Sequence, residues 1–278
     1  MEGPTSRPTG RSLARISFLG TALLGPQYRP AEDLIEIDVT YECNLKCIGC
    51  NRSCRQAPDE TRLSPAQLQK FIDETISTGR KWKRIRVMGG EPTTHPEIVQ
   101  ILWMLADYKT EYNPDVSLEV VTNGLWEGLH SLIRTFPSSV AVTNTHKASA
   151  TSNKFENFNL APKDDYHQAF TDFRNGCWIM EECGLGLTPY GYYPCAVAGG
   201  IDRVIGLNIG LKHLPSEAQD GHTLTMQQRS LCQWCGHFRS REKLHTKDRP
   251  IASEPLYSLS WVKAYGSYSE QKPKLSLY

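Results

Sequence analysis

The side chains best suited to chemistry in this 278-residue sequence are its nine cysteines, which fall into two separate groups. The first group consists of Cys43, Cys47, Cys50 and Cys54, and the stretch from residue 55 to residue 176 holds no cysteine. The second group consists of Cys177, Cys183, Cys195, Cys232 and Cys235. An odd number argues against a fully paired disulfide scaffold, and thiols clustered in this way favour bound metal.

The first group has a spacing that suits an iron–sulfur cluster. Cys43, Cys47 and Cys50 form a C-x3-C-x2-C motif, and three thiolates on one loop hold three irons of a 4Fe–4S cluster while the fourth iron stays open for another ligand. The alternative is a closed zinc site in which Cys54 is the fourth ligand. The spacing alone leaves both open.

The elements that must position this loop alternate between strand and helix. Strands are expected at 34–40, 84–88, 117–121 and 139–144, and helices at 65–78, 95–108 and 128–136. This alternation predicts an α/β fold with a parallel sheet, in which polar residues after the strands meet at one edge. The chain is too short for an eight-fold barrel plus a cysteine-rich tail, so we expect a partial barrel.

The cysteine loop follows the first expected strand, and Gly89-Gly90-Glu91-Pro92 follows the second. These two motifs, one βα unit apart, resemble the radical S-adenosylmethionine (SAM) superfamily. The resemblance implies a partial (β/α)6-type barrel and a 4Fe–4S cluster on Cys43, Cys47 and Cys50. It further implies that the open iron chelates SAM, which is cleaved reductively to a 5′-deoxyadenosyl radical that abstracts a hydrogen atom.

The resemblance also assigns SAM-binding residues beyond the cysteines. Glu91 would accept a hydrogen bond from the SAM amino group beside Gly89, Gly90 and Pro92. Contacts to the SAM carboxylate and ribose fall to Asn123, Thr143 and Asn144, for which ordinary strand-end capping is the alternative. The sequence departs from the family at Gly49, where many members carry an aromatic residue near the adenine.

The second cysteine group resembles the SPASM and twitch extensions of radical SAM enzymes. A hairpin around Pro189-Tyr190-Gly191 has a cysteine near each end, and Cys232-x2-Cys235 follows. The resemblance implies one auxiliary 4Fe–4S cluster on four thiolates, and a four-cysteine zinc site is the alternative. These four are Cys183, Cys195, Cys232 and Cys235, and Cys177 either replaces one of them or packs beside Trp178.

The chain divides into four expected parts: an N-terminal arm (1–33), a radical SAM core (34–175), the auxiliary cluster region (176–238) and a basic aromatic tail (239–278). The formal net charge is +1 and no stretch reaches the length of a membrane span, so neither nucleic acid nor a membrane is an expected partner. The N-terminus lacks a secretory pattern, which together with the thiols predicts a cytoplasmic protein.

These features predict a radical SAM oxidoreductase that acts on a small polar metabolite such as a sugar, a cyclitol or a nucleoside-like molecule. Dehydrogenation would send one electron to the auxiliary cluster, and a flavodoxin or ferredoxin would reduce the first cluster. An epimerase or rearrangement enzyme is an alternative, with Cys54 or Tyr192 as hydrogen donor. Modification of a ribosomally made peptide and a non-catalytic metal-binding module are the others.

Overall fold

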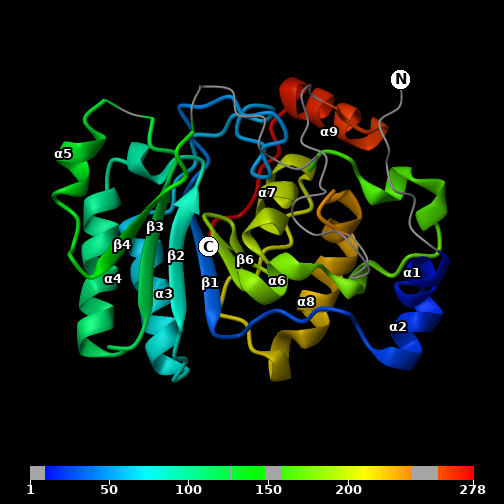
Figure 1. Ribbon diagram of the computed structural model, residues 1–278, viewed down its shortest axis with the longest axis horizontal. Coiled ribbons are helices and arrows are strands. Elements are labelled where there is room, and N and C mark those ends of the chain that lie inside the picture. The colour runs from blue at the N-terminus through cyan, green and yellow to red at the C-terminus, as the bar shows by residue number, and fades with distance from the viewer. Residues whose placement is uncertain (1–9, 126, 148–157, 239–255) are drawn as a thin grey trace.

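Six strands form one open sheet in the computed structural model, which describes residues 10–125, 127–147, 158–238 and 256–278 (Figure 1). The sheet order is β4-β3-β2-β1-β5-β6, and every neighbouring pair is parallel except the hairpin β5–β6. The strands are β1 (Leu34–Thr40), β2 (Arg84–Gly89), β3 (Ser117–Thr122), β4 (Val140–Asn144), β5 (Leu185–Thr188) and β6 (Gly191–Tyr193). The expected α/β fold with a partial barrel is confirmed, and the sheet is open rather than closed.

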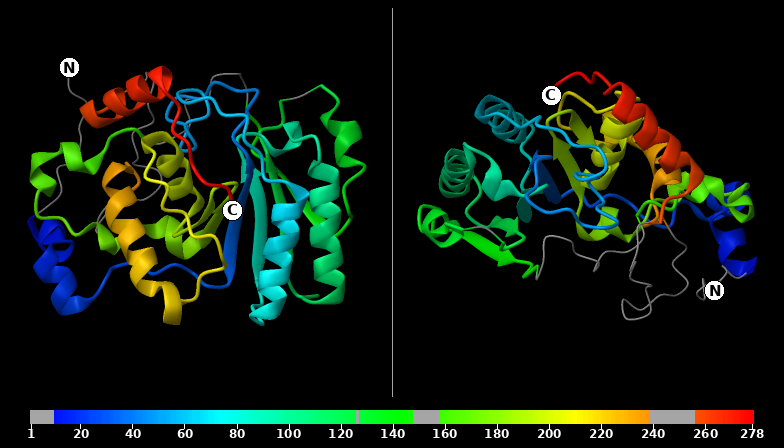
Figure 2. Two further views of the ribbon diagram at one scale, coloured as in Figure 1. Left: turned by 180° about the vertical axis from the view of Figure 1, so that it is seen from behind. Right: turned by 90° about the horizontal axis from the view of Figure 1, so that it is seen from above.

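Nine α-helices lie within the described residues. They are α1 (Gly10–Arg15), α2 (Phe18–Leu24), α3 (Pro65–Ser77), α4 (Ile98–Glu111), α5 (Leu129–Ile133), α6 (Trp178–Glu182), α7 (Ala196–Ile205), α8 (Glu217–Leu231) and α9 (Leu259–Glu270). Short 3-10 turns occur at Pro92–Thr94 (η1), Pro162–Asp164 (η2), Tyr166–Gln168 (η3), Phe173–Asn175 (η4) and Cys232–Trp234 (η5). Figure 2 shows α3 and α4 on one side of the sheet and α7, α8 and α9 toward the other.

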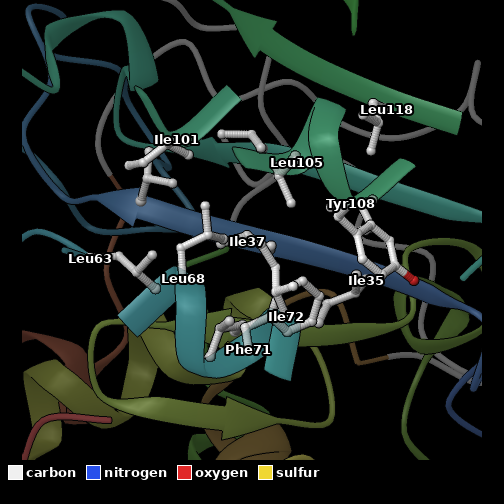
Figure 3. Packing of buried hydrophobic residues seen from close by; sticks show 14 of the residues in the cluster. Ile35, Ile37, Leu63, Leu68, Phe71, Ile72, Ile101, Leu105, Tyr108 and Leu118 are labelled. Carbon is white, nitrogen blue, oxygen red and sulfur yellow. The ribbon is translucent and has the colours of Figure 1, made fainter. Parts of the chain in front are cut away.

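The outer face of the sheet packs against α3 and α4. Alternate residues of the central strands point there, with Ile35 and Ile37 fully buried, and they meet Leu68 and Phe71 of α3 (Figure 3). Each such side chain contributes about 1.5–3 kcal/mol when it is fully buried. Because strand side chains alternate, the residues between them must face the opposite side of the sheet.

The opposite side carries a second apolar cluster, built on α7 and α9. It contains Tyr193, Val197, Ile201 and Trp261 together with several cysteines of the second group. The basic aromatic tail is therefore partly a helix, α9, whose Trp261, Tyr265 and Tyr268 are buried. The tail segment 239–255 lies outside the described residues.

Local hydrogen bonds determine where the helices begin. Helix α8 begins at Glu217, because Ser216 accepts a hydrogen bond from the Gln219 amide and caps it. The helix expected from His95 begins at Ile98, because Pro92–Thr94 forms a separate 3-10 turn. At α3 the expected start is confirmed, with a capping box between Ser64 and Gln67.

Candidate functional site

The cysteine loop after β1 is joined to the Gly89–Glu91 turn by backbone hydrogen bonds. The Gly90 amide donates to the Thr40 carbonyl and the Glu91 amide to the Glu42 carbonyl, each at 2.8 Å. A Cβ atom on Gly90 would lie 2.0 Å from the Glu42 oxygen, so only glycine permits this approach. The two motifs that the sequence analysis paired are therefore in direct contact at the carboxyl edge of the sheet.

The Glu91 carboxylate is buried behind this turn and ties β2 to β3. Its Oε1 accepts hydrogen bonds from the Thr93 amide (3.2 Å), the Thr93 hydroxyl (2.6 Å) and the Thr122 hydroxyl (2.7 Å). Its Oε2 accepts one bond from a protein group, from the Asn123 amide at 2.7 Å. A carboxylate oxygen accepts more than one bond, so Oε2 retains capacity for a further donor.

The thiols of the first group gather beside Glu91. Burial, together with the nearby Cys50, Glu91 and Cys47, raises the pKa of Cys43 to about 12, although a hydrogen bond from the Leu45 amide opposes the shift. A hydrogen bond from the Cys54 thiol lowers the pKa of Cys50 to about 6. Three thiols on one loop, one of them easily ionised, form a donor set that fits an iron–sulfur cluster.

The strand-end residues expected to contact SAM are engaged with protein groups. Asn123 donates to Asn44 Oδ1 at 2.7 Å, and its own Oδ1 accepts from the Leu125 amide at 2.8 Å. Asn144 Oδ1 accepts from the His146 amide at 2.8 Å, which is the strand-end capping given above as the alternative. Asn44 lies within the cysteine loop, so Asn123 contacts that loop directly.

A ladder of charged side chains crosses the inner face of the sheet, the face opposite α3 and α4. Arg86 of β2 donates to Glu36 of β1 at 3.2 Å and to Glu119 of β3 at 2.6 Å, and the Thr143 hydroxyl of β4 donates to Glu119 at 2.5 Å. The register pairs Glu36 with Arg86 and Arg86 with Glu119. Thr143, one residue before the end of β4, therefore takes part in this ladder.

Arg52 extends the ladder toward the cysteine loop. Its Nη2 donates to Glu36 Oε2 at 3.0 Å and its Nε to Asp38 Oδ2 at 3.1 Å, and all three side chains are almost fully buried. Burial raises the pKa of Asp38 to about 6 although Arg52 opposes the shift. Sequence reasoning missed these residues; the only available signal was the polar alternation Glu36-x-Asp38 within a strand flanked by apolar residues.

Four thiols of the second group lie together between η4, α7 and η5. Burial raises the pKa of Cys232, and the nearby thiols of Cys177, Cys195 and Cys235 raise it further. Cys177, Cys195 and Cys235 are buried members of one apolar cluster. The turns η4 and η5, which lie next to Cys177 and Cys232 in sequence, also contact each other. This set contains Cys177, which the sequence analysis did not place among the four expected cluster ligands.

Cys183 lies on the edge of this set and faces the ladder. Burial, followed by a nearby, hydrogen-bonded Glu36 carboxylate, raises the pKa of Cys183 to about 12. Cys183 is half-buried and packs against the apolar cluster that contains Cys177, Cys195 and Cys235. The structure thus places Cys183 between the second group of thiols and the inner face of β1.

The two residues considered as hydrogen donors lie in different places. The Cys54 thiol is buried against Cys50, next to the first group. The Tyr192 hydroxyl lies on the outer face of the sheet, where it contacts Glu74 at 3.2 Å and Tyr278 at 3.1 Å. Tyr192 is therefore separated from the inner face by the sheet itself.

Two further observations concern the described residues as a whole. Among the described residues, no three Cys, His, Asp or Glu side chains are arranged to hold a metal ion. In the same part of the chain, no helix is long and apolar enough to cross a bilayer. A cavity of about 340 Å³ lies away from both thiol groups, between residues 21–32, Arg80 and α8. Since no cysteine lines it, the chemistry argues against this cavity as the reaction site.

Residues 37–137 match the model of the radical SAM superfamily. Curated relatives include GTP 3′,8-cyclase of Campylobacter jejuni subsp. doylei, 32% identical over 104 residues that make up 37% of this chain and 31% of the relative. GTP 3′,8-cyclase of Aliarcobacter butzleri is 34% identical over 94 residues, 33% of this chain and 27% of the relative. The aligned segment thus spans less than a third of these relatives.

Among solved structures, BtrN in complex with AdoMet and 2-DOIA aligns with a TM-score of 0.46 and 15% identity, over 79% of this chain and 99% of BtrN. BtrN in an open conformation aligns with a TM-score of 0.43 and 17% identity, over 77% of this chain and 98% of BtrN.

Proposed function

We propose that this chain, whose residues 37–137 match the radical SAM superfamily model, is an enzyme that cleaves SAM reductively. The observation that carries the proposal is the junction of the two motifs, in which backbone bonds at 2.8 Å fix the Gly89–Glu91 turn against the loop of Cys43, Cys47 and Cys50. A 4Fe–4S cluster on those thiolates supplies the electron that splits SAM into methionine and a 5′-deoxyadenosyl radical.

The residues around the cluster have separate tasks in this proposal. Gly89, Gly90 and Pro92 let the turn approach the ligand closely, and Glu91 Oε2 accepts a hydrogen bond from the SAM amino group. Asn123 holds the cysteine loop through Asn44. The hydrogen-bonded positions of Thr143 and Asn144 favour support of the adjacent strands over direct SAM contact.

We further propose an auxiliary 4Fe–4S cluster on Cys177, Cys195, Cys232 and Cys235. The sequence expectation used Cys183 in place of Cys177. The mutual interactions of the other four thiols support the exchange, as does the hydrogen bond that turns Cys183 toward Glu36. Iron is favoured over zinc by the resemblance to twitch extensions, and metal analysis of the purified protein distinguishes the two.

The reaction that fits two clusters is oxidation of a secondary alcohol on a small polar metabolite. Removal of the hydrogen atom from the carbinol carbon and of the proton from its hydroxyl would leave one electron, which an auxiliary cluster held by the second group of thiols would accept, so that the product is a ketone. The charged inner face beside Glu36 and Arg86 supports a polar rather than an apolar substrate, since its ion pairs bind hydroxyl and amino groups.

A radical epimerase is the second candidate, and the position of Cys183 favours it. An epimerase needs a hydrogen-atom donor beside the substrate, and the Cys183 thiol faces the inner side of the sheet. Neither Cys54 nor Tyr192 has that position. Cys183→Ala would abolish product formation in an epimerase while it leaves a dehydrogenase active.

The test is anaerobic reconstitution followed by incubation with dithionite and SAM. We expect 5′-deoxyadenosine by mass spectrometry, and none from the variant with Cys43, Cys47 and Cys50 all changed to alanine. That variant keeps about half of the wild-type iron if the auxiliary cluster exists. Incubation with deuterated sugars and cyclitols then identifies the substrate by transfer of deuterium into 5′-deoxyadenosine. Failure of the wild-type protein to cleave SAM would contradict the proposal.

A further inference from the structure

Helix α7 joins the two thiol groups. It starts directly after Cys195, which is its N-cap residue, and Arg203 lies near its end. Eight residues separate these two positions, which is about 12 Å along a helix. All of α7 from Ala196 to Val204 is buried, so it is a rigid connection through the interior rather than a surface helix.

Arg203 binds the segment that follows the first cysteine motif. Its side chain is fully buried, and it donates to the Arg52 carbonyl at 2.6 Å and to the Ala57 carbonyl at 2.7 Å. The guanidinium also lies 4.3 Å from the centre of the Tyr41 ring, at the end of β1. Arg203 therefore contacts both ends of the loop that presents the three thiols.

The hydrogen bonds that stabilise the buried positive charge of Arg203 go to loop carbonyls rather than to a carboxylate. The nearest acidic group in contact is Asp59 at 3.9 Å, and Asp59 is already bound by Lys272 at 2.6 Å and by the Tyr190 hydroxyl at 2.7 Å. Arg203 Nε has no hydrogen-bond partner among the described residues. Since an uncompensated buried guanidinium is costly, any displacement of the loop away from Arg203 is strongly disfavoured.

The packing around α7 leaves the loop little freedom. A Cβ atom on Gly200 would lie 3.3 Å from both the Arg52 Cα and the Asn51 carbonyl oxygen, so helix and loop backbones touch there. On the other side α9 holds the same loop, because Tyr265 pairs with the Ser53 hydroxyl at 2.8 Å and Tyr268 donates to the Pro58 carbonyl at 2.9 Å.

We propose that Arg203 is a positioning residue that fixes the loop of residues 50–59, and with it Cys50, against the helix that starts at the auxiliary thiols. A disturbance at Cys195 is thereby transmitted through α7 to the loop that holds the first cluster. The functional part of this inference rests on the proposed two-cluster enzyme, whereas the positioning of the loop is a property of the chain without metal.

The metal-free full-length protein gives the direct test, because Cys54 is buried within the loop of residues 50–59. The measurement is the alkylation rate of Cys54 by iodoacetamide, followed by mass spectrometry, in wild type, Arg203→Met and Arg203→Lys. We expect both variants to raise the Cys54 rate at least about tenfold by local opening, while the rate at Cys177 stays unchanged. Lysine keeps the charge but lacks the fork that reaches two carbonyls.

The matched control is Val204→Ala, which removes buried volume from the same helix but leaves both Arg203 hydrogen bonds to the loop in place. Equal Cys54 rates in wild type and both Arg203 variants would overturn the proposal, as would a Cys177 rate that rises in step with Cys54. An equal increase in Val204→Ala would overturn it too. If circular dichroism finds Arg203→Met unfolded, Arg203→Lys decides the question.

The reconstituted protein supplies a second readout. We expect Arg203→Lys to lose about half of its iron to a chelator at least about tenfold faster than wild type does, while the other half is released at the wild-type rate. Equal release of both halves would contradict the selective effect. If wild-type protein takes up no iron at all, the two-cluster function fails, and the alkylation rates still decide whether Arg203 positions the loop.

Discussion

Replacement of Glu91 by glutamine tests whether a buried carboxylate holds the Gly89–Glu91 turn against the end of β3. The change keeps the size of the side chain and replaces one oxygen by an amide nitrogen that only donates. Oε1 accepts from three donors and Oε2 from the Asn123 amide, so the glutamine places its nitrogen against Asn123, where the fewest bonds are lost.

The size of the effect follows from that contact. One hydrogen bond to a charged acceptor is lost, worth about 1.5–3 kcal/mol, and a buried amide donor is left without a partner, at a further cost of about 1–3 kcal/mol. The three bonds to the remaining oxygen also weaken because that oxygen no longer carries charge. We therefore expect Glu91→Gln to reduce the free energy of unfolding by about 2.5–6 kcal/mol.

Urea unfolding of the metal-free protein, followed by circular dichroism, measures this difference without any cofactor. Glu97→Gln is the matched control, because Glu97 is exposed and six residues away, and it should change the unfolding free energy by less than about 0.5 kcal/mol. A loss below about 1 kcal/mol for Glu91→Gln would show that the network around Glu91 does not hold the turn.

Three further outcomes are expected. Gly90→Ala forces a methyl group against a carbonyl oxygen at 2.0 Å, and should cut iron uptake at the first site while the second site still fills, as measured by iron content and electron paramagnetic resonance. Cys177→Ser should lower iron content by about half whereas Cys183→Ser should leave it unchanged; the reverse result would restore the original assignment. Because burial raises the pKa of Asp38 to about 6, the folded state binds the proton more tightly than the unfolded state does, so this stabilisation is complete below about pH 4 and is lost as the pH rises through 6. The wild type should gain on the order of 2–3 kcal/mol from it between pH 7 and pH 4 in urea titrations, and Asp38→Asn should lack that gain.

The elements of the fold could be predicted from the sequence because each carries a local signal. The alternating run at 34–40 and the Ser64-Pro65 start of α3 depend on neighbouring residues alone, and both are confirmed. The sheet order could not be predicted in this way. The placement of β5 beside β1 depends on packing between segments far apart in the chain, such as the fit of Gly186 against the start of α7, where a Cβ would lie 2.2 Å from the Ala196 amide.

The same division applies to the site. The cysteine motif and the Gly89–Glu91 turn are each a short, contiguous segment of the sequence. The contact between them follows from the parallel sheet. The grouping of thiols in the second half depends on where α6 and η5 pack, which is why the set implied by the twitch resemblance uses Cys183 and the set proposed from the fold uses Cys177. The buried charges of Arg52 and Arg203 had no sequence signal, because their partners are a strand and a loop that become neighbours only after folding.

The pairing of β1 with β5 has a consequence for synthesis of the chain. Ile35 pairs with Leu185 about 150 residues later, and the Arg203 contacts to the cysteine loop span 146 and 151 residues. At about 5–20 residues per second, a ribosome takes roughly 8–30 s to make that intervening chain. During this interval the loop of residues 50–59 lacks α7 and the Arg203 hydrogen bonds that hold it. The contacts that fix this loop therefore form only late in synthesis, and oxidation of Cys54, which is buried in the finished fold, should depend on translation speed.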